Sequence, residues 1–350
     1  MTVPAFLDEL WPLGWSVGVF LLATGVTVVC SVRLAGVGDT LADRTGWGEA
    51  FFGAVLFGVV TSLSGVVMTA VSAAADQPQL AYGNAVGGIA AQTVAIAVAD
   101  VFHRQANLEH AAASLRNMMF GCLLIVLLGI ALMATFSPEV TVLGVHPASV
   151  ALVALYGGGL WLVRGQGAPM WQAVPTKETL ADVPAEEDGD DELAGRSTRR
   201  LWTEFAAAAL LVMVGGWAVA RAAEGIVAGS GLSAGLVGAV FMGLVNALPE
   251  TVTSIAAVRR GAVTLAIAAI IGGNCLDALN LVVGDIAYRG GSLFHTATPA
   301  QLFLTSGALV MTAVLLGGLL VRQRTGWLGV GFDGVLLLTI YLATVGVLAF

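Results

Sequence analysis

Long apolar runs alternate with short polar connections along nearly the whole chain. A helix needs about 20 mostly apolar residues to cross a bilayer, and these runs lack the two-residue alternation of barrel strands. The pattern therefore predicts about ten transmembrane helices. In the first half they lie at about 15–33, 50–75, 80–101, 117–136 and 147–163, and in the second half at about 202–222, 233–258, 262–287, 301–321 and 327–349.

One long polar stretch, residues 164–200, separates the two halves and contains the acidic run from Glu178 to Glu192. It has almost no apolar periodicity, which is typical of a flexible linker. We therefore predict three parts, a first transmembrane repeat at 1–163, the acidic linker, and a second transmembrane repeat at 201–350. Because many acids lie in this linker, the formal net charge of -8 says little about partners.

Composition supports the membrane assignment. The 350 residues are 57% hydrophobic and only 11% charged, about half the charge of an ordinary globular chain. With the N-terminus outside, the cytoplasmic loops collect thirteen basic residues and the outer loops two, which agrees with the positive-inside rule. We expect an integral plasma membrane protein with both termini outside and the linker cytoplasmic. The inside set is Arg33, Arg44, Arg104, Arg116, Arg164, Lys177, Arg196, Arg199, Arg200, Arg259, Arg260, Arg322 and Arg324, and the outside set is Arg221 and Arg289.

The two halves are related by an internal repeat. Residues 53–100 align with 238–285 without a gap at a constant offset of 185, and about a dozen positions are identical. Each half has an odd number of predicted spans, so the second half inserts upside down relative to the first. We predict an all-α membrane protein of two inverted five-helix repeats, with a substrate site near the bilayer midplane where the repeats meet.

Two carboxylates, Glu250 and Asp277, lie well inside predicted spans. An ionisable side chain there costs on the order of 2.5–3.5 kcal/mol on insertion scales, so its presence needs a reason. Asn246 lies one helical turn before Glu250, and Asn274 and Asn280 flank Asp277. A structural ion pair is the alternative, but the predicted spans contain no Lys or Arg to pair with these acids.

The matching helices of the first repeat carry neutral polar residues, namely Thr61, Ser62, Asn84 and Gln92. Repeat symmetry places them opposite the acids. The resulting all-oxygen, anionic site suits hard cations, whereas soft metals would need Cys or His ligands. The four histidines all fall in loops or at span ends.

Asp100 and Asp285 lie near the ends of predicted spans, where a carboxylate can reach water. We interpret both as structural residues. A role in gating or in a vestibule is the alternative.

The repeat motifs resemble those of the Ca²⁺:cation antiporter superfamily, which includes the Na⁺/Ca²⁺ exchangers and carries the patterns (T/S)-S-L-P-E and G-N-x-x-G-S-N. Here the first repeat reads TSLSG at 61–65 and GNAVGGI at 83–89, and the second reads NALPE at 246–250 and GGN at 272–274. The resemblance implies ion binding at the positions of Gly65, Gln92, Glu250 and Asp277. This chain departs from the pattern because Gly65 replaces a glutamate, Gly88 and Gly273 replace serines, and Ile89 replaces an asparagine.

The resemblance implies a secondary active cation antiporter that exchanges Ca²⁺ for Na⁺ or H⁺ by alternating access. We therefore expect that the chain is not an enzyme and that it uses no cofactor apart from the transported ions. Two alternatives remain, a monovalent (Na⁺ or K⁺)/H⁺ antiporter and a non-transporting relic of the fold. The partners expected are inorganic cations and the lipid bilayer, and not nucleic acid, while the oligomeric state stays open.

Overall fold

The computed structural model describes residues 10–45, 62–103, 106–112, 114–164, 174, 176, 179, 193, 195–259, 261–326 and 330–350. Helices make up the regular structure of this part of the chain. They are α2 (Leu13–Thr45), α5 (Leu63–Ala74), α6 (Pro78–Asp100), α7 (Leu108–Ala111), α8 (Leu115–Thr135), α9 (Pro147–Arg164), α11 (Thr198–Ser230), α12 (Ala234–Leu236), the π-helix η2 (Val237–Met242), α13 (Gly243–Arg259), α14 (Val263–Asp277), α15 (Asn280–Ala287), the 3-10 helix η3 (Leu293–Thr296), α16 (Pro299–Val321) and α17 (Phe332–Ala349).

Eight helical segments of the described residues are long and apolar enough to cross a membrane. Two shorter apolar helices, Leu63–Ala74 and Pro147–Val163, occupy two further predicted spans. This confirms the all-α class and agrees with a count of about ten. The first part of the predicted span at 50–75, and most of the predicted linker, lie outside the described residues.

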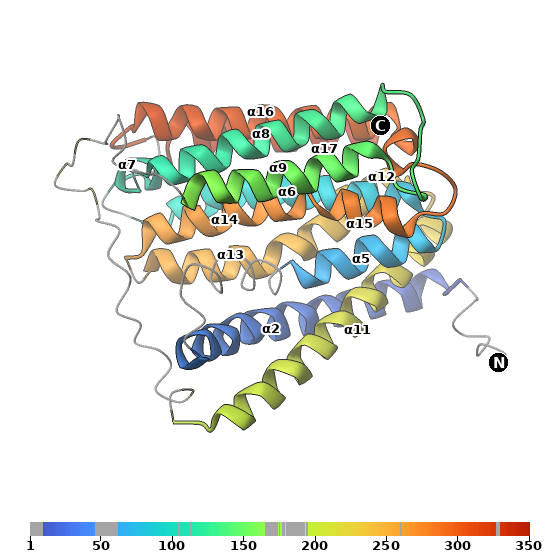
Figure 1. Ribbon diagram of the computed structural model, residues 1–350, viewed down its shortest axis with the longest axis horizontal. Coiled ribbons are helices and arrows are strands. Elements are labelled where there is room, and N and C mark those ends of the chain that lie inside the picture. The colour runs from blue at the N-terminus through green and yellow to red at the C-terminus, as the bar shows by residue number, and fades with distance from the viewer. Residues whose placement is uncertain are drawn as a thin grey trace.

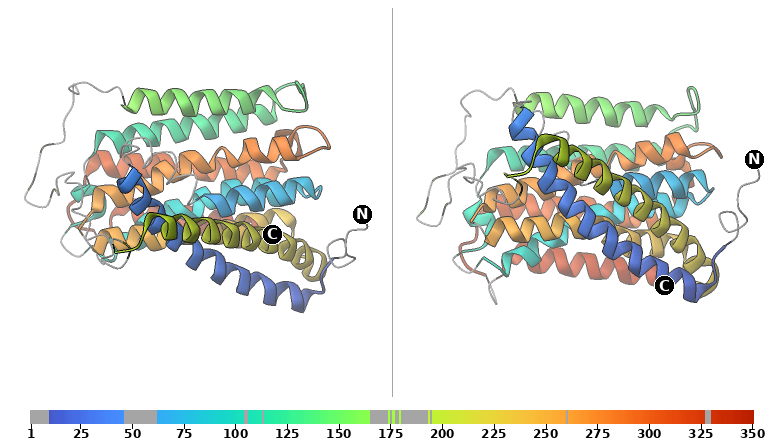
Figure 2. Two further views of the ribbon diagram at one scale, coloured as in Figure 1. Left: turned by 60° about the horizontal axis from the view of Figure 1, so that its bottom comes forward. Right: turned by 90° about the horizontal axis from the view of Figure 1, so that it is seen from below.

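Helices of both repeats surround α6, which runs through the middle of the bundle (Figure 1). It packs against α5, η2, α13, α14, α16 and α17, and almost all of its residues are buried. Figure 2 shows α2 and α11 lying together across one face of the bundle at an oblique angle. α2 begins and α17 ends at the same end of the bundle, as an even number of spans requires.

Glycines allow α2 and α11 to approach closely. A Cβ atom added at Gly229 would lie 2.8 Å from Leu13 Cβ, and one added at Gly225 would lie 2.8 Å from the carbonyl oxygen of Trp11. Small residues at a helix contact in lipid permit backbones to come together and gain dispersion energy. The contact therefore holds the first helix of one repeat against the first helix of the other.

Both of these helices are 33 residues long and extend well beyond the predicted spans. Arg33 and Arg221, which lie at the ends of predicted spans and are counted with the loops by the sequence pattern, are therefore well inside helices. Each has an acidic partner, since Arg33 Nη2 lies 3.3 Å from Glu204 and Arg221 pairs with Glu224. These ion pairs allow the helices to continue past their most apolar stretch, which hydropathy alone does not register.

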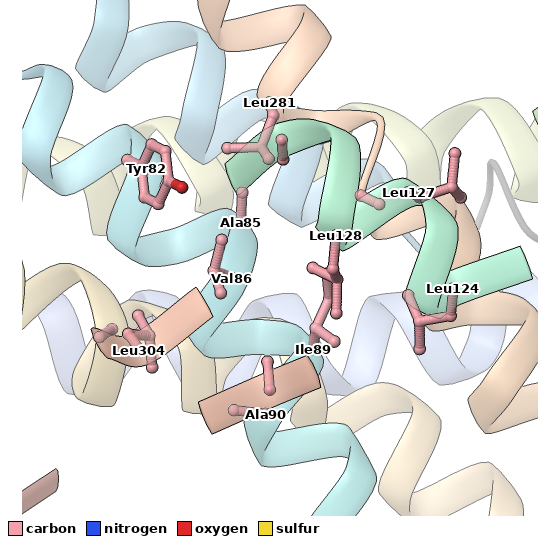
Figure 3. Packing of buried hydrophobic residues seen from close by; sticks show 14 of the residues in the cluster. Tyr82, Ala85, Val86, Ile89, Ala90, Leu124, Leu127, Leu128, Leu281 and Leu304 are labelled. Atoms are coloured by element: carbon pink, nitrogen blue, oxygen red, sulfur yellow. The ribbon is translucent and has the colours of Figure 1, made fainter. Parts of the chain in front are cut away.

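The largest apolar core lies between α6 and the helices α8, α15 and α16 (Figure 3). Tyr82, Val86 and Ile89 are fully buried there, in the same cluster as Leu128 of α8. The phenol of Tyr82 shares a hydrogen bond of 3.0 Å with Thr305 Oγ1, so its one polar group is satisfied. This packing makes α6 a rigid axis for the polar side chains that it carries on its other face.

The pseudo-twofold relation between the repeats is visible at Asp100 and Asp285. Asp100 accepts from the backbone N–H groups of Leu108 (2.7 Å) and Gly331 (3.1 Å). Asp285 accepts from those of Leu293 (3.0 Å) and His146 (2.8 Å), and Leu293 and His146 are related to Leu108 and Gly331 by the same offset of 185. Each carboxylate therefore fastens a loop of its own repeat to the other repeat.

These two acids do not reach water, contrary to the expectation from their positions near span ends. Asp100 is 1% exposed and Asp285 is 0% exposed. Their hydrogen bonds support the structural interpretation. The same symmetric arrangement also shows that the sequence repeat corresponds to a repeat in three dimensions.

We predict that Asp285→Ala lowers the free energy of unfolding by about 2 kcal/mol or more, because two backbone N–H groups and the Ser149 hydroxyl lose a charged acceptor. Asp285→Asn should have a smaller effect, since its amide oxygen still accepts. Thermal unfolding in detergent measures both, with Glu139→Ala, at an exposed position, as the control. An Asp285→Ala variant as stable as the wild type would contradict the structural role.

Candidate ion-binding site

Contact between glycine-bearing faces of α6 and the second repeat sets the position of the site. A Cβ atom added at Gly83 would lie 2.8 Å from the backbone nitrogen of Ala239, and one added at Gly243 would lie 2.6 Å from the carbonyl carbon of Gly87. The backbones therefore touch along η2 and the start of α13, which glycine alone permits. This close approach brings the next turns of both helices, with their polar side chains, into contact.

Asp277 is the last residue of α14, well inside the predicted span at 262–287. A two-residue turn, Ala278–Leu279, separates α14 from α15, but both residues keep right-handed helical backbone angles, and Val263–Ala287 forms one apolar span. The carboxylate therefore projects from within a spanning segment, where an ionisable group is costly and needs a reason.

Three amides from different segments donate hydrogen bonds to the fully buried Asp277 carboxylate. Gln92 Nε2 lies 2.6 Å and Asn246 Nδ2 lies 2.9 Å from Oδ2, and Asn280 Nδ2 lies 3.3 Å from Oδ1. The Ser62 hydroxyl is buried beside the same carboxylate. Gln92 and Asp277 are equivalent positions of the two repeats, so this contact lies on the pseudo-twofold axis.

Glu250 borders the same group of side chains from α13. It is 3% exposed. A Cβ atom added at Gly273 would lie 3.9 Å from Glu250 Cγ and 3.6 Å from Gln92 Oε1. Glu250 and Gln92 therefore approach the same point of α14, one turn before Asp277.

The amides that donate to protein groups leave their carbonyl oxygens buried. Within the described residues, the side-chain oxygens of Asn84, Gln92, Asn246 and Asn274 have no hydrogen-bond partner. A buried acceptor without a partner costs about 1–3 kcal/mol, so such groups are few in ordinary cores. Oxygen atoms from both repeats, near two carboxylates, are what a desolvated hard cation would use as ligands.

The structure brings some predicted site residues together and separates others. Asn84 donates to Gly65 O (3.1 Å) and Thr69 Oγ1 (2.8 Å), and Asn274 donates to Thr93 Oγ1 (2.9 Å). These two amides therefore brace helices beside the site. Thr61 lies outside the described residues.

Amide groups, and not arginine, face the Asp277 carboxylate in the described part of the chain. The ion pairs of Arg33, Arg196 and Arg200 with Glu204 and of Arg221 with Glu224 involve acids of α11 instead. The alternative of a structural ion pair at Asp277 has no support in this geometry.

Two stretches that together span most of the chain, residues 15–164 and 201–350, match the family model described as sodium/calcium exchanger protein. The chain belongs to the sodium/calcium exchanger family. The two matched stretches correspond to the two predicted repeats, and the resemblance to the Ca²⁺:cation antiporter superfamily is confirmed. No curated protein sequence matches the chain significantly.

Solved structures share the fold of this family member. The H⁺/Ca²⁺ exchanger CAX is 13% identical with a TM-score of 0.68, and the similarity covers 99% of this chain and 87% of that one. Native YfkE is 14% identical with a TM-score of 0.63, covering 94% and 91%. The sodium-calcium exchanger NCX_Mj, soaked with Na⁺ and Sr²⁺, is 16% identical with a TM-score of 0.54, covering 95% and 98%.

A second group of acids in this exchanger-family chain escaped the sequence analysis. Asp100, Glu109 and Asp333 come from α6, α7 and α17, and all three are buried. Burial raises the pKa of Glu109 well above its usual range, and the neighbouring Asp333 and Asp100 raise it further. Glu109 lies between predicted spans, where hydropathy gives no sign of burial.

We expect Glu109→Gln to reduce the dependence of stability on pH. Because the pKa of Glu109 is raised in the folded protein, the folded state holds a proton that the unfolded state releases, and stability falls as pH rises above about 4.3. The variant should match the wild type near about pH 4 and exceed it near about pH 8. The exposed control Glu139→Gln should follow the wild type at every pH. If the melting temperature of Glu109→Gln also changed with pH in the same way as that of the wild type, the prediction would be wrong.

Asp277→Asn should abolish the stabilisation of the protein by cations while leaving it folded. The new NH₂ group would face amides that already donate, and one of two carboxylate ligands would be lost. A ligand at 100 times its dissociation constant stabilises by about 2.7 kcal/mol, so the melting temperature in Ca²⁺ or Na⁺ reports binding. Asp76→Asn makes the same change at an exposed position. Equal cation-induced shifts in both variants would exclude Asp277 from the site.

Proposed function

We propose that this chain is a secondary active cation antiporter that binds its ions between Glu250 and Asp277 and exposes them to the two sides of the membrane in turn. The observation that carries the proposal is the buried Asp277 carboxylate, which lies inside a spanning segment and accepts hydrogen bonds from amides of both repeats. An ionisable side chain inside a membrane-spanning bundle is costly even when amides surround it, and such residues mark ion or substrate sites. Membership of the sodium/calcium exchanger family supports the same conclusion.

Ca²⁺ and either Na⁺ or H⁺ are the ions that we propose are exchanged. Ca²⁺ takes 6–8 oxygen ligands, and carboxylates and amides are its usual protein ligands. A pair of carboxylates balances one divalent cation, two monovalent cations or two protons. Two proteins of similar fold are described as a sodium-calcium exchanger and an H⁺/Ca²⁺ exchanger. Both couplings agree with this charge balance.

A monovalent (Na⁺ or K⁺)/H⁺ antiporter is the second candidate, favoured by the absence of a carboxylate at Gly65. In the part of the chain that the structure describes, no three His, Cys, Asp or Glu side chains converge as a metal site. Fewer fixed charges weaken the attraction for a divalent ion more than for a monovalent one. Measured fluxes of each ion separate the two candidates.

The proposed location is the plasma membrane, with both termini outside and the acidic linker in the cytoplasm. The start of α2 and the end of α17 share one end of the bundle, and α11 begins at the other (Figure 1). At the start of α11, Arg33, Arg196 and Arg200 surround Glu204. A basic end of this kind favours the cytoplasmic side.

Fluxes in proteoliposomes test the proposal. The wild type should accumulate Ca²⁺ when a Na⁺ or a proton gradient is imposed, and Glu250→Gln should reduce the apparent Ca²⁺ affinity by at least about tenfold, because a charged ligand becomes neutral. Glu139→Gln, at an exposed position, is the matched control.

Each outcome of the flux assay has a definite meaning. Undiminished Ca²⁺ and Na⁺ fluxes in Glu250→Gln would remove Glu250 from the mechanism. Fluxes of Na⁺ or K⁺ against H⁺ without Ca²⁺ would favour the monovalent antiporter. A wild-type protein that moves none of Ca²⁺, Na⁺, K⁺ and H⁺ would identify a non-transporting relic.

A further inference from the structure

The largest difference between the two repeats at the site is at Gly65, which has no side chain where its equivalent has a carboxylate. The offset of 185 that relates Gln92 to Asp277 also relates Gly65 to Glu250 and Thr61 to Asn246. Where the second repeat contributes an acidic side chain to the site, the first contributes only a glycine. Symmetry alone would leave an empty volume next to Gly65.

The side chain of Asn246 fills that volume. A Cβ atom added at Gly65 would overlap the Asn246 carboxamide, lying 2.8 Å from Cγ and 3.1 Å from Nδ2 and closer still to Oδ1. A Cβ atom added at Gly88 would lie 2.5 Å from Nδ2 and 3.3 Å from Cγ of the same residue. Two glycines from α5 and α6 therefore form a cradle around one amide from α13.

This cradle differs from the backbone contacts at Gly83 and Gly243. At Gly83 and Gly243 the atoms that an added Cβ would meet belong to backbones, as expected where two helices touch. At Gly65 and Gly88 the nearest atoms all belong to the side chain of Asn246. Neither glycine has a positive φ, so volume and not backbone conformation explains the missing side chain.

The cradled amide also belongs to the ion site. Asn246 is 0% exposed, its Nδ2 donates to Asp277 Oδ2 at 2.9 Å, and its Oδ1 has no hydrogen-bond partner among the described residues. One neutral group thus occupies the volume beside position 65 and fixes a carboxylate of the site. A larger residue at 65 or 88 would have to displace it.

We propose that Asn246 is the specificity-determining residue of the site, because it occupies with a neutral amide the volume that an acidic side chain at position 65 would need. The site then keeps only the two carboxylates of the second repeat. It balances one divalent cation or two monovalent ions, and not a larger charge. The part of this inference that concerns ion selectivity rests on the proposed function. The part that concerns the steric contact between Asn246 and position 65 does not.

Steric coupling is tested first, by thermal unfolding in detergent without any transported ion. Gly65→Ala should lower the melting temperature by about 3 °C or more, since the added methyl group overlaps Asn246. In an Asn246→Ala background the same change should be neutral or stabilising, because alanine favours helix over glycine. Gly272→Ala, whose added Cβ would meet nothing within 4 Å, is the control and should not destabilise either background.

The effect of a carboxylate at position 65 is tested next with the double variant Gly65→Glu/Asn246→Ser. Removing the amide makes room for the new glutamate, so this variant should fold better than Gly65→Glu alone and should bind Ca²⁺ at least about tenfold more tightly than the wild type. Gly65→Gln/Asn246→Ser has the same shape without the charge and should not gain affinity. Calcium titration of the melting temperature and calorimetry measure both.

Distinct results overturn distinct parts of the account. Equal destabilisation by Gly65→Ala in both backgrounds would show that Asn246 is not what keeps position 65 small. Equal Ca²⁺ affinity of the two double variants, Gly65→Glu/Asn246→Ser and Gly65→Gln/Asn246→Ser, would overturn the role of Asn246 in selectivity. A wild type that binds no cation, together with intact steric coupling, would refute the proposed function and the selectivity while the cradle itself stands.

Discussion

A carboxylate buried among apolar helices, that of Asp277, is the constraint on which the rest of the site depends. Lipid and packed apolar side chains cannot solvate it, so the protein must supply donors. Gln92, Asn246 and Asn280 do so from three segments, and each must be held in place by the fold. The glycine contacts of α6 and the cradle around Asn246 both serve that requirement.

The inverted repeat explains how a chain of this size builds such a centre. Equivalent residues meet at the axis, where Gln92 touches Asp277, and equivalent loops are fastened by Asp100 and Asp285 on opposite sides. The symmetry of the scaffold does not extend to the charge. Both site carboxylates come from the second repeat, which makes the first repeat the donor of amides and hydroxyls.

Much of this could be predicted from the sequence, because spans and repeats follow from composition and register. The class of about ten spans, the exchanger family and the placement of Gln92 opposite the acids of the second repeat all rest on patterns of this kind. The hydrogen bonds from Gln92, Asn246 and Asn280 to one carboxylate could not be predicted, since hydropathy says nothing about how side chains point inside a bundle. Nor could the burial of Glu109 or the placement of Asn246 between Gly65 and Gly88, which depend on contacts between distant segments.

Crystals of the wild-type protein soaked separately in Sr²⁺ and Tl⁺ would test the central claim most directly through anomalous scattering. The account predicts an anomalous peak between Glu250 and Asp277, with oxygen atoms at about 2.3–2.6 Å from the Sr²⁺ ion as for Ca²⁺. The amide oxygens of Gln92 or Asn246 should be among the ligands. Peaks confined to other acids, such as Glu204 or Glu139, with none beside Asp277, would contradict it.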